Sequence, residues 1–265
     1  MPLLVPATCF KLFFRRLHIV AGLIGPIAIT ALLVQTPALI AQTSNALDLA
    51  FKHLTIDDGL SQGMVLAIHQ DRQGFMWFGT KDGLNRYDGY RFSIFRNDPF
   101  DSTSLSNNYI QTIFEDRRGR LWIGTTDGLN CFDPATEKFR RFLHDPDDPH
   151  SLSGNSIYAI CEAPAPVNEA KGVTVLWIGT LDGGLNKLVL RENDAAPSSD
   201  HDVITYQSRS ADPGSLSSNR IWDLVIDRAG VLWIGTDRGL CRLNPPHSLS
   251  PADDQRVNFT RYTRN

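Results

Sequence analysis

The side chains best suited to bind a ligand stand just before or just inside a short strand that recurs along the chain. Asparagine recurs there at Asn108, Asn155 and Asn219, with Gly63 at the first position. Aromatic, amide and cationic residues in such a place can recognise a sugar or a similar small molecule by stacking and hydrogen bonding. The alternative, which turn chemistry favours, is that the asparagines only shape their own turns. The candidate binding residues are Lys81, Asn108, Tyr109, Asn155, Tyr158, Arg220 and Trp222.

Carboxylates also recur, in the pairs Asp82-Gly83, Asp127-Gly128 and Asp182-Gly183. A ring of carboxylates could bind a cation, but Asp-Gly is equally the preferred two-residue hairpin turn. The fourth copy has Arg238 in place of the aspartate, which fits a turn better than a symmetric metal ring. The acidic segment at 145–149 lacks the regular ligand spacing of a calcium loop. We therefore expect no metal site and no cofactor.

The sequence shows none of the known catalytic arrangements of residues. No G-x-S-x-G, H-E-x-x-H or P-loop motif occurs. Carboxylate pairs such as Asp57-Asp58 and Asp147-Asp148 stand in turns, where solvated charge is the default. The histidines do not share a repeat position, as His53, His69, His144, His150, His201 and His247 show. We expect a chain without catalytic residues.

The elements that must position these residues are four copies of one unit. Each copy carries the motif Trp-x-Gly-Thr, preceded by Leu-Ser and an apolar i, i+3 pattern that ends in Asp in most copies. Each unit reads as four short strands separated by turns, which is typical of a β-propeller blade. One twisted sheet cannot bury both faces alone, so blades must stack, and we predict that the tryptophans pack between them. These structural tryptophans are Trp77, Trp122, Trp177 and Trp233.

The fold predicted is all-β, a β-propeller of four-stranded blades at about 60–98, 105–146, 152–212 and 216–265, within a repeat region at 47–265. Residues 51–56 are predicted to form a lone strand before the first blade. Four complete blades plus one orphan strand predict an incomplete ring, whose end faces would expose apolar surface and an unpaired edge. Segments around 163–172 and 191–202 are predicted insertions that form solvated loops on one rim of the third blade.

Residues 1–46 have a different composition. Basic residues from Lys11 to Arg16 precede an apolar run from Ile19 to Val34, and small residues follow it. This order is typical of a secretory signal peptide. The alternative is an uncleaved membrane anchor over about residues 17–40. Both readings export the remainder, so we expect a periplasmic or extracytoplasmic protein that is either secreted or anchored by its N-terminal segment.

Charge and cysteine content exclude some further classes of protein and of binding site. The formal net charge of −3 argues against a nucleic-acid partner, which would require a basic face. Aromatic residues make up 9% of the chain, too many for a disordered protein. Beyond Cys9 in the N-terminal segment, Cys131, Cys161 and Cys241 show no metal-ligand spacing. We read them as small hydrophobic residues.

The segment from His53 to Phe92, and the returning pattern Asp-Pro, Ser-Leu-Ser, Asn-x-Ile, Leu-Trp-Ile-Gly-Thr and Asp-Gly-Leu, resemble the two-component regulator propeller repeat. The resemblance covers about residues 50–265. It implies the periplasmic sensor region of a hybrid histidine kinase or a related regulator. In that family such regions contain more blades and are followed by an immunoglobulin-like domain, a membrane helix and a transmitter, which carries the kinase activity.

The function we expect is therefore an extracytoplasmic sensor that binds a small molecule, an oligosaccharide or a partner, as the N-terminal part of a longer two-component receptor. A second hypothesis is an exported propeller scaffold, which binds proteins by self-association or through a transmitter partner. A third is a propeller lyase or glycosidase, because propellers host such chemistry.

Overall fold

The computed structural model describes residues 51–164, 173–191, 202–244 and 257–263. The predicted signal or anchor at 1–46 lies outside these residues, as does most of both insertions predicted in the third blade. Within the described ranges, no helix has the length and apolar character needed to cross a bilayer.

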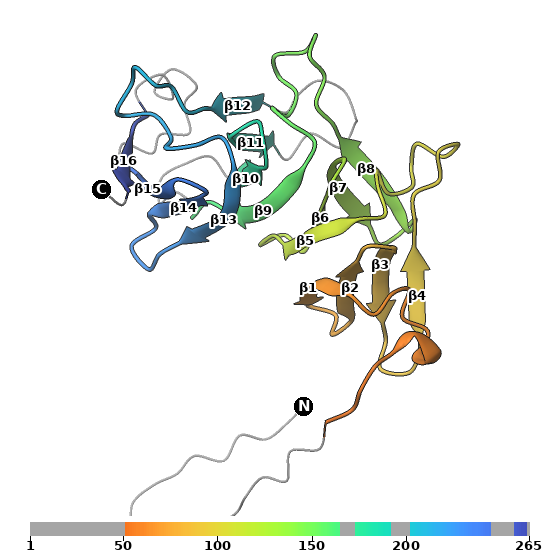
Figure 1. Cartoon of the computed structure of the whole chain (residues 1–265). Coiled ribbons are helices and arrows are strands. Elements are labelled where there is room, and N and C mark those ends of the chain that lie inside the picture. Colours follow the sequence, from red (N-terminus) through yellow and green to blue (C-terminus); the bar gives the residue numbers. More distant parts are fainter. Residues whose placement is uncertain (1–50, 165–172, 192–201, 245–256, 264–265) are drawn as a thin grey trace, which may run out of the picture. The chain divides into compact units, whose positions relative to one another are not determined.

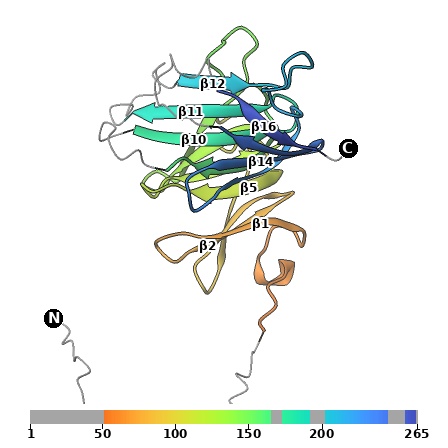
Figure 2. The ribbon, with the colours of Figure 1, turned by 90° about the vertical axis from the view of Figure 1, so that its left-hand side faces the viewer.

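The described residues fold into four antiparallel sheets of four strands each, in which strands adjacent in sequence are adjacent in space (Figure 1). We call the sheets blades 1 to 4. Blade 1 has strands β1 (Val65–Gln70), β2 (Met76–Thr80), β3 (Gly83–Tyr87) and β4 (Phe92–Phe95). Blade 2 has β5 (Ile110–Glu115), β6 (Leu121–Thr125), β7 (Gly128–Asp133) and β8 (Lys138–Phe142). Blade 3 has β9 (Ile157–Glu162), β10 (Val173–Thr180), β11 (Leu185–Arg191) and β12 (Asp202–Tyr206). Blade 4 has β13 (Ile221–Ile226), β14 (Leu232–Thr236), β15 (Gly239–Leu243) and β16 (Phe259–Tyr262). Figure 2 shows β10, β11 and β12 side by side.

The tight turn between the second and third strands explains the recurring Asp-Gly pair. In blade 1, Gly83 has φ of 111°, a conformation that glycine adopts without a Cβ penalty. The Thr80 hydroxyl accepts the Asp82 backbone N–H at 3.0 Å and donates to the Gly83 carbonyl at 3.0 Å. The corresponding glycines of the other blades, Gly128, Gly184 and Gly239, also have positive φ. The turn therefore depends on threonine and glycine, which all four copies share.

The hydrophobic cores lie between consecutive blades. In each blade one face carries the motif tryptophan, and we call it the tryptophan face. The opposite face carries the residue that follows the tryptophan, and we call it the isoleucine face after Ile123, Ile178 and Ile234. Three clusters each join the tryptophan face of one blade to the isoleucine face of the next. In the first, Trp77 of blade 1 packs with Ile123 and Phe132 of blade 2. The tryptophans of blades 1 to 3 thus pack between blades, as the repeat pattern predicts.

The motif glycine makes room for the neighbouring blade. A Cβ added at Gly79 would lie 2.6 Å from Cγ2 of Ile110 in blade 2, and one at Gly179 would lie 2.5 Å from Cγ2 of Ile221 in blade 4. Real Cβ atoms do not approach other atoms so closely, so only glycine admits this isoleucine. The third position of Trp-x-Gly-Thr is therefore explained by packing between sheets, and not by a turn.

The lone strand predicted at 51–56 is wrong. Residues 51–55 have no regular secondary structure, and Ile56–Asp58 forms a short 3-10 helix. A capping box closes this helix, since the Thr55 hydroxyl accepts the Asp57 N–H and the Asp58 carboxylate accepts the Thr55 N–H. A strand needs a neighbouring strand to satisfy its backbone, whereas this capped turn satisfies its donors locally.

Candidate functional site

The structure arranges five of the seven predicted binding residues in two separate groups. The Lys81 ammonium lies 5.2 Å from the ring centroid of Tyr109. Tyr158 on β9 and Trp222 on β13 meet edge to face, with ring centroids 5.2 Å apart. The Arg220 guanidinium lies 5.9 Å from the centroid of the Trp222 ring. The second group, Tyr158, Trp222 and Arg220, is the candidate site, because it joins two aromatic rings and a cation across blades 3 and 4.

The other two predicted residues, Asn108 and Asn155, hold the chain in place. The Asn108 side-chain oxygen accepts the Asn97 backbone N–H at 2.6 Å, and its backbone carbonyl accepts the Gly83 N–H of blade 1 at 2.8 Å. Asn155 repeats both bonds, accepting the His144 N–H at 2.7 Å and the Gly128 N–H at 2.6 Å. These contacts match the turn-forming alternative.

The Asp-Gly turns do not gather carboxylates around a common point. Asp82 forms an ion pair with Arg96 at 2.9 Å, and the Asp82 and Asp127 backbone N–H groups bond the preceding threonine hydroxyls. In the part of the chain that the structure describes, no three histidine, cysteine or acidic side chains come close enough to hold a metal ion.

The exposure of the candidate site suits a ligand with an apolar ring face. Trp222 is 45% exposed, unusual for so large an aromatic side chain, while Tyr158 is half-buried and holds it edge-on. Arg220 is exposed beside the Trp222 ring, so a cation is available to an anionic substituent. Stacking on an aromatic face together with a charged contact is a common way to bind a sugar or sugar acid.

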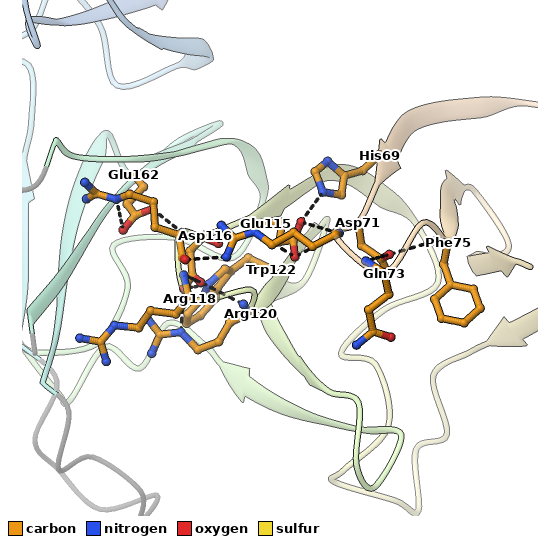
Figure 3. Close-up of polar contacts among 12 residues, drawn as sticks. His69, Asp71, Gln73, Phe75, Glu115, Asp116, Arg118, Arg120, Trp122 and Glu162 are labelled. Carbon is orange, nitrogen blue, oxygen red and sulfur yellow. Dashed lines mark hydrogen bonds and ion pairs between the residues drawn. The ribbon is translucent and has the colours of Figure 1, made fainter. Parts of the chain in front are cut away.

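A second set of polar side chains, which our reading of the sequence did not identify, lies at the turns between the first and second strands (Figure 3). The indole N–H of Trp122 donates to the Asp116 carboxylate at 3.0 Å, and the same oxygen accepts from Arg120 at 2.6 Å. Trp77 and Trp233 bond Asp71 and Asp227 in the same way, at 2.7 and 2.9 Å. The bond from the Trp233 indole and the backbone N–H of Val231 lower the pKa of Asp227 below its ordinary value. The sequence signal for this contact is an aspartate six residues before the motif tryptophan, which only the third copy lacks.

Neighbouring blades are also joined by polar contacts at these turns. The Arg117 backbone N–H donates to the Glu162 carboxylate of blade 3 at 2.8 Å, and the two side chains form an ion pair at 2.9 Å. Arg72 of blade 1 likewise donates its backbone N–H to Glu115 of blade 2 at 3.2 Å. His69 lies 3.5 Å from the Glu115 carboxylate, whose side chain is only 10% exposed (Figure 3). These contacts fix blade 1 to blade 2 and blade 2 to blade 3, and they leave the carboxylates little access to solvent.

The thiols lie on three different strands, β7, β9 and β15. Burial raises the pKa of Cys131 and of Cys161 to about 12. A thiol with so high a pKa is a poor nucleophile near neutral pH, because the thiolate is the reactive form.

Comparison with known proteins identifies the repeats. The model of the family described as "Two component regulator propeller" matches residues 59–82, 104–127 and 215–238. A segment of 66 residues, 25% of this chain, is 54% identical to Histidine kinase P4 of Formosa agariphila. That segment corresponds to 5% of the kinase.

Solved structures share the fold. The extracellular domain of the putative hybrid two component system BT4673 from B. thetaiotaomicron matches 80% of this chain with a TM-score of 0.58 and 24% identity. The extracellular domain of the putative hybrid two component system BT3049 from the same organism matches 73% with a TM-score of 0.44 and 28% identity. The chain spans 27% and 30% of these two structures. The match to the BT4673 domain shows that the four sheets are propeller blades, and two-component regulator propeller repeats are matched at the start of blades 1, 2 and 4.

Proposed function

We propose that this chain is the extracytoplasmic sensor segment of a two-component receptor, the N-terminal part of a longer histidine kinase or regulator. The observation that supports this most strongly is the matched repeat, together with the segment that is 54% identical to part of a histidine kinase. The matching solved structures are extracellular domains, which supports the same location for this chain. Ligand binding would act by shifting the balance between two arrangements of the receptor.

Within this role, we propose that Tyr158, Trp222 and Arg220 bind an oligosaccharide, with preference for one that carries a carboxylate. The Trp222 ring offers a stacking surface that Tyr158 orients, and Arg220 beside it would pair with the acid group. Asp223, also exposed on β13, would accept a hydroxyl donor from the same ligand.

We propose further that the segment binds without catalysing a reaction. The pair His69 and Glu115 would be the closest approach to a general acid and base, but it lies between blades 1 and 2 with the Glu115 side chain 10% exposed. The exposed aromatic site contains the cation of Arg220 and the carboxylate of Asp223. Among the described residues, no histidine is paired with that carboxylate.

The location is tested by probing the native product in fractions of its own cells with an antibody against the repeats. We expect it in the membrane or periplasm, with the epitope open to protease added outside the cytoplasmic membrane. A membrane band far above 29.5 kDa would support the longer receptor. A band in the cytoplasm would contradict the proposal.

The binding site is tested by calorimetry with the full chain and defined probes, namely glucuronate and galacturonate oligomers beside neutral gluco-oligosaccharides. Trp222→Ala is expected to weaken binding of an oligomer about tenfold, equivalent to about 1.4 kcal/mol. Arg220→Met is expected to remove the preference for the acidic oligomers. The matched control is Tyr90→Ala, which removes an aromatic side chain that is 93% exposed elsewhere in the chain. Equal effects of Trp222→Ala and the control would contradict the assignment.

A further inference from the structure

The first strand of every blade contains a β-bulge at the same position of the repeat. In blade 2, the partners of Ile110 and Thr112 on β6 are adjacent residues, so Gln111 between them is an extra residue without a partner. The same shift in register leaves one extra residue in the first strands of blades 1, 3 and 4. A bulge bends its strand and redirects the side chain that it carries, and bulges are common beside functional sites. The four bulge residues are Leu66, Gln111, Tyr158 and Trp222.

The residue at the bulge differs in every blade, whereas the residue before it is always branched and apolar. In blades 2 to 4 this preceding residue packs on the motif glycine of the blade before. Packing between blades therefore determines the preceding position and leaves the bulge position free to vary. The branched residues are Val65, Ile110, Ile157 and Ile221.

The bulges follow one another in space because the first strands of consecutive blades are neighbours. Strand β1 lies beside β5, β5 beside β9 and β9 beside β13 (Figure 1). Tyr158 and Trp222, with ring centroids 5.2 Å apart, show that side chains at consecutive bulges can meet. By the same step of the repeat, Gln111 precedes Tyr158 by one blade, on the side opposite to Trp222.

The polar groups of this row are available to a ligand. Within the described part of the chain, the Gln111 amide, the Tyr158 hydroxyl and the Trp222 indole N–H form no hydrogen bond. By contrast, the Asn130 amide, at a position that recurs on the third strand, both accepts from and donates to Ser106. A half-buried amide such as that of Gln111 loses free energy unless water or a ligand supplies its hydrogen bonds.

We propose that Gln111 is a further ligand-binding residue, which extends the candidate site by one blade and lets consecutive units of an oligosaccharide lie along consecutive bulges. The inference rests on the proposed function, since it takes the ligand to be an oligosaccharide. Arg220 and Trp222 hold the unit that carries the carboxylate, and the Gln111 amide, which can donate and accept, bonds the hydroxyls of a later unit. The affinity then increases with the length of the sugar chain until the chain reaches Gln111.

Calorimetry with the full chain tests this extension, with galacturonate oligomers and neutral gluco-oligosaccharides, each from the monosaccharide to the tetrasaccharide. Gln111→Ala is expected to weaken binding of the tetrasaccharide about fivefold, the effect of one lost hydrogen bond, and to leave binding of the monosaccharide unchanged. The matched control is Gln73→Ala, which removes an exposed amide outside the row of bulges.

A second variant gives a result that a misfolded protein could not produce. Gln111→Trp introduces at the bulge of blade 2 the residue that blade 4 has there. It should strengthen binding of the tetrasaccharide about threefold, through one added stacking contact, and again leave the monosaccharide unaffected.

Equal effects of Gln111→Ala and Gln73→Ala at every chain length would overturn the extension. So would a loss in Gln111→Ala that is the same for the monosaccharide and the tetrasaccharide, because it would indicate a disturbed strand. In either case, a loss of binding in Trp222→Ala would leave the proposed function standing. If no probe binds the parent chain, the oligosaccharide assignment fails together with the extension.

Discussion

The tryptophan faces of blades 2 and 4 carry the same tetrapeptide, Trp-Ile-Gly-Thr, in different surroundings. Trp122 is 1% exposed and packs against blade 3, whereas Trp233 is half-buried and contacts Tyr262 and Arg242 of its own sheet. Both indoles bond an aspartate six residues earlier in the chain. The local geometry of the motif is therefore independent of the neighbour, but its burial is not. The motif encodes a contact between blades, and the energy it contributes depends on whether the next blade is present.

Replacing the tryptophan should show this difference most strongly. Trp122→Ala is expected to lower the free energy of unfolding by about 3–5 kcal/mol, because it opens a cavity between blades 2 and 3. Trp233→Ala should cost less than half of that, since its side chain is only half-buried and no other described blade packs on it. Urea unfolding followed by circular dichroism measures both. Equal losses would mean that the indole bond to aspartate, and not packing between blades, provides the stability.

The motif glycine gives the next largest contrast. Gly179→Val should destabilise the fold at the upper end of about 1–3 kcal/mol, because the new side chain collides with Ile221. Gly235→Val lies in the same tetrapeptide, but an added Cβ there meets only Asp223 of its own blade, at 3.6 Å or more, so it should be neutral or slightly stabilising. The pair is compared by thermal unfolding at low protein concentration. A large loss of stability in Gly235→Val would show that another part of the chain packs on Gly235.

A buried amide distinguishes blades 1 to 3 from blade 4 on the isoleucine face. Asn130 is fully buried, accepts the Ser106 backbone N–H at 2.9 Å and donates to the Ser106 hydroxyl at 2.9 Å. Asn85 and Asn186 make the same two bonds, whereas in blade 4 the sulfur of Cys241 receives the Ser217 N–H at 3.3 Å.

Asn130→Ala should therefore cost about 2 kcal/mol, because it leaves a buried donor without its acceptor. Cys241→Asn should raise the stability of the chain by about 1 kcal/mol, because it replaces a weak acceptor by a stronger one. Chemical denaturation of both variants beside the parent chain measures these values. A loss on Cys241→Asn would indicate that blade 4 has repacked around the smaller sulfur group.

The repeat unit, the four strands and the packing of three tryptophans were predictable from the sequence, because the repeat period and the recurring tryptophan can both be read directly from it. The roles of Asn130 and Asp116 were not, since each depends on where a partner lies after the chain has folded: Ser106 is 24 residues from Asn130. The strand predicted at 51–56 was wrong because an apolar and β-branched composition says nothing about whether a neighbouring strand is available. The capped turn at Thr55 and Asp58 uses the same residues locally.

The candidate binding site shows the same limit. Tyr158 and Trp222 are 64 positions apart in the numbering, and only the stacking of blades 3 and 4 brings their rings to 5.2 Å. The repeat register placed both near the start of a blade's first strand, which was enough to propose the site. For Asn108 and Asn155, turn chemistry already favoured a turn-forming role over ligand binding, and their contacts in the structure match that role.

The smallest expected effect concerns an arginine on the fourth strand, at which blade 4 resembles blade 2 on the isoleucine face. Arg141 of blade 2 donates to the backbone carbonyls of Ser104 and Asp101, at 2.8 Å each, in the loop that precedes the blade. Arg261 of blade 4 makes the same bonds to Ser215 and Asp212, at 2.7 Å each. At this side, Cys241 is thus the position at which blade 4 lacks a polar contact that blade 2 makes with its asparagine.

Blade 3 has the exposed Thr205 at this position, and its preceding loop presents the corresponding carbonyls of Asp148 and Ser151. Thr205→Arg should raise the free energy of unfolding by about 1 kcal/mol, by supplying the hydrogen bonds that the other two loops already have. Arg141→Ala should lower it by a similar amount, and Thr205→Lys serves as the control, because it adds the charge without the planar fork. If lysine stabilises as well as arginine, the acidic loop responds to charge alone, and the bonds to carbonyl oxygens in blades 2 and 4 contribute little to the fold.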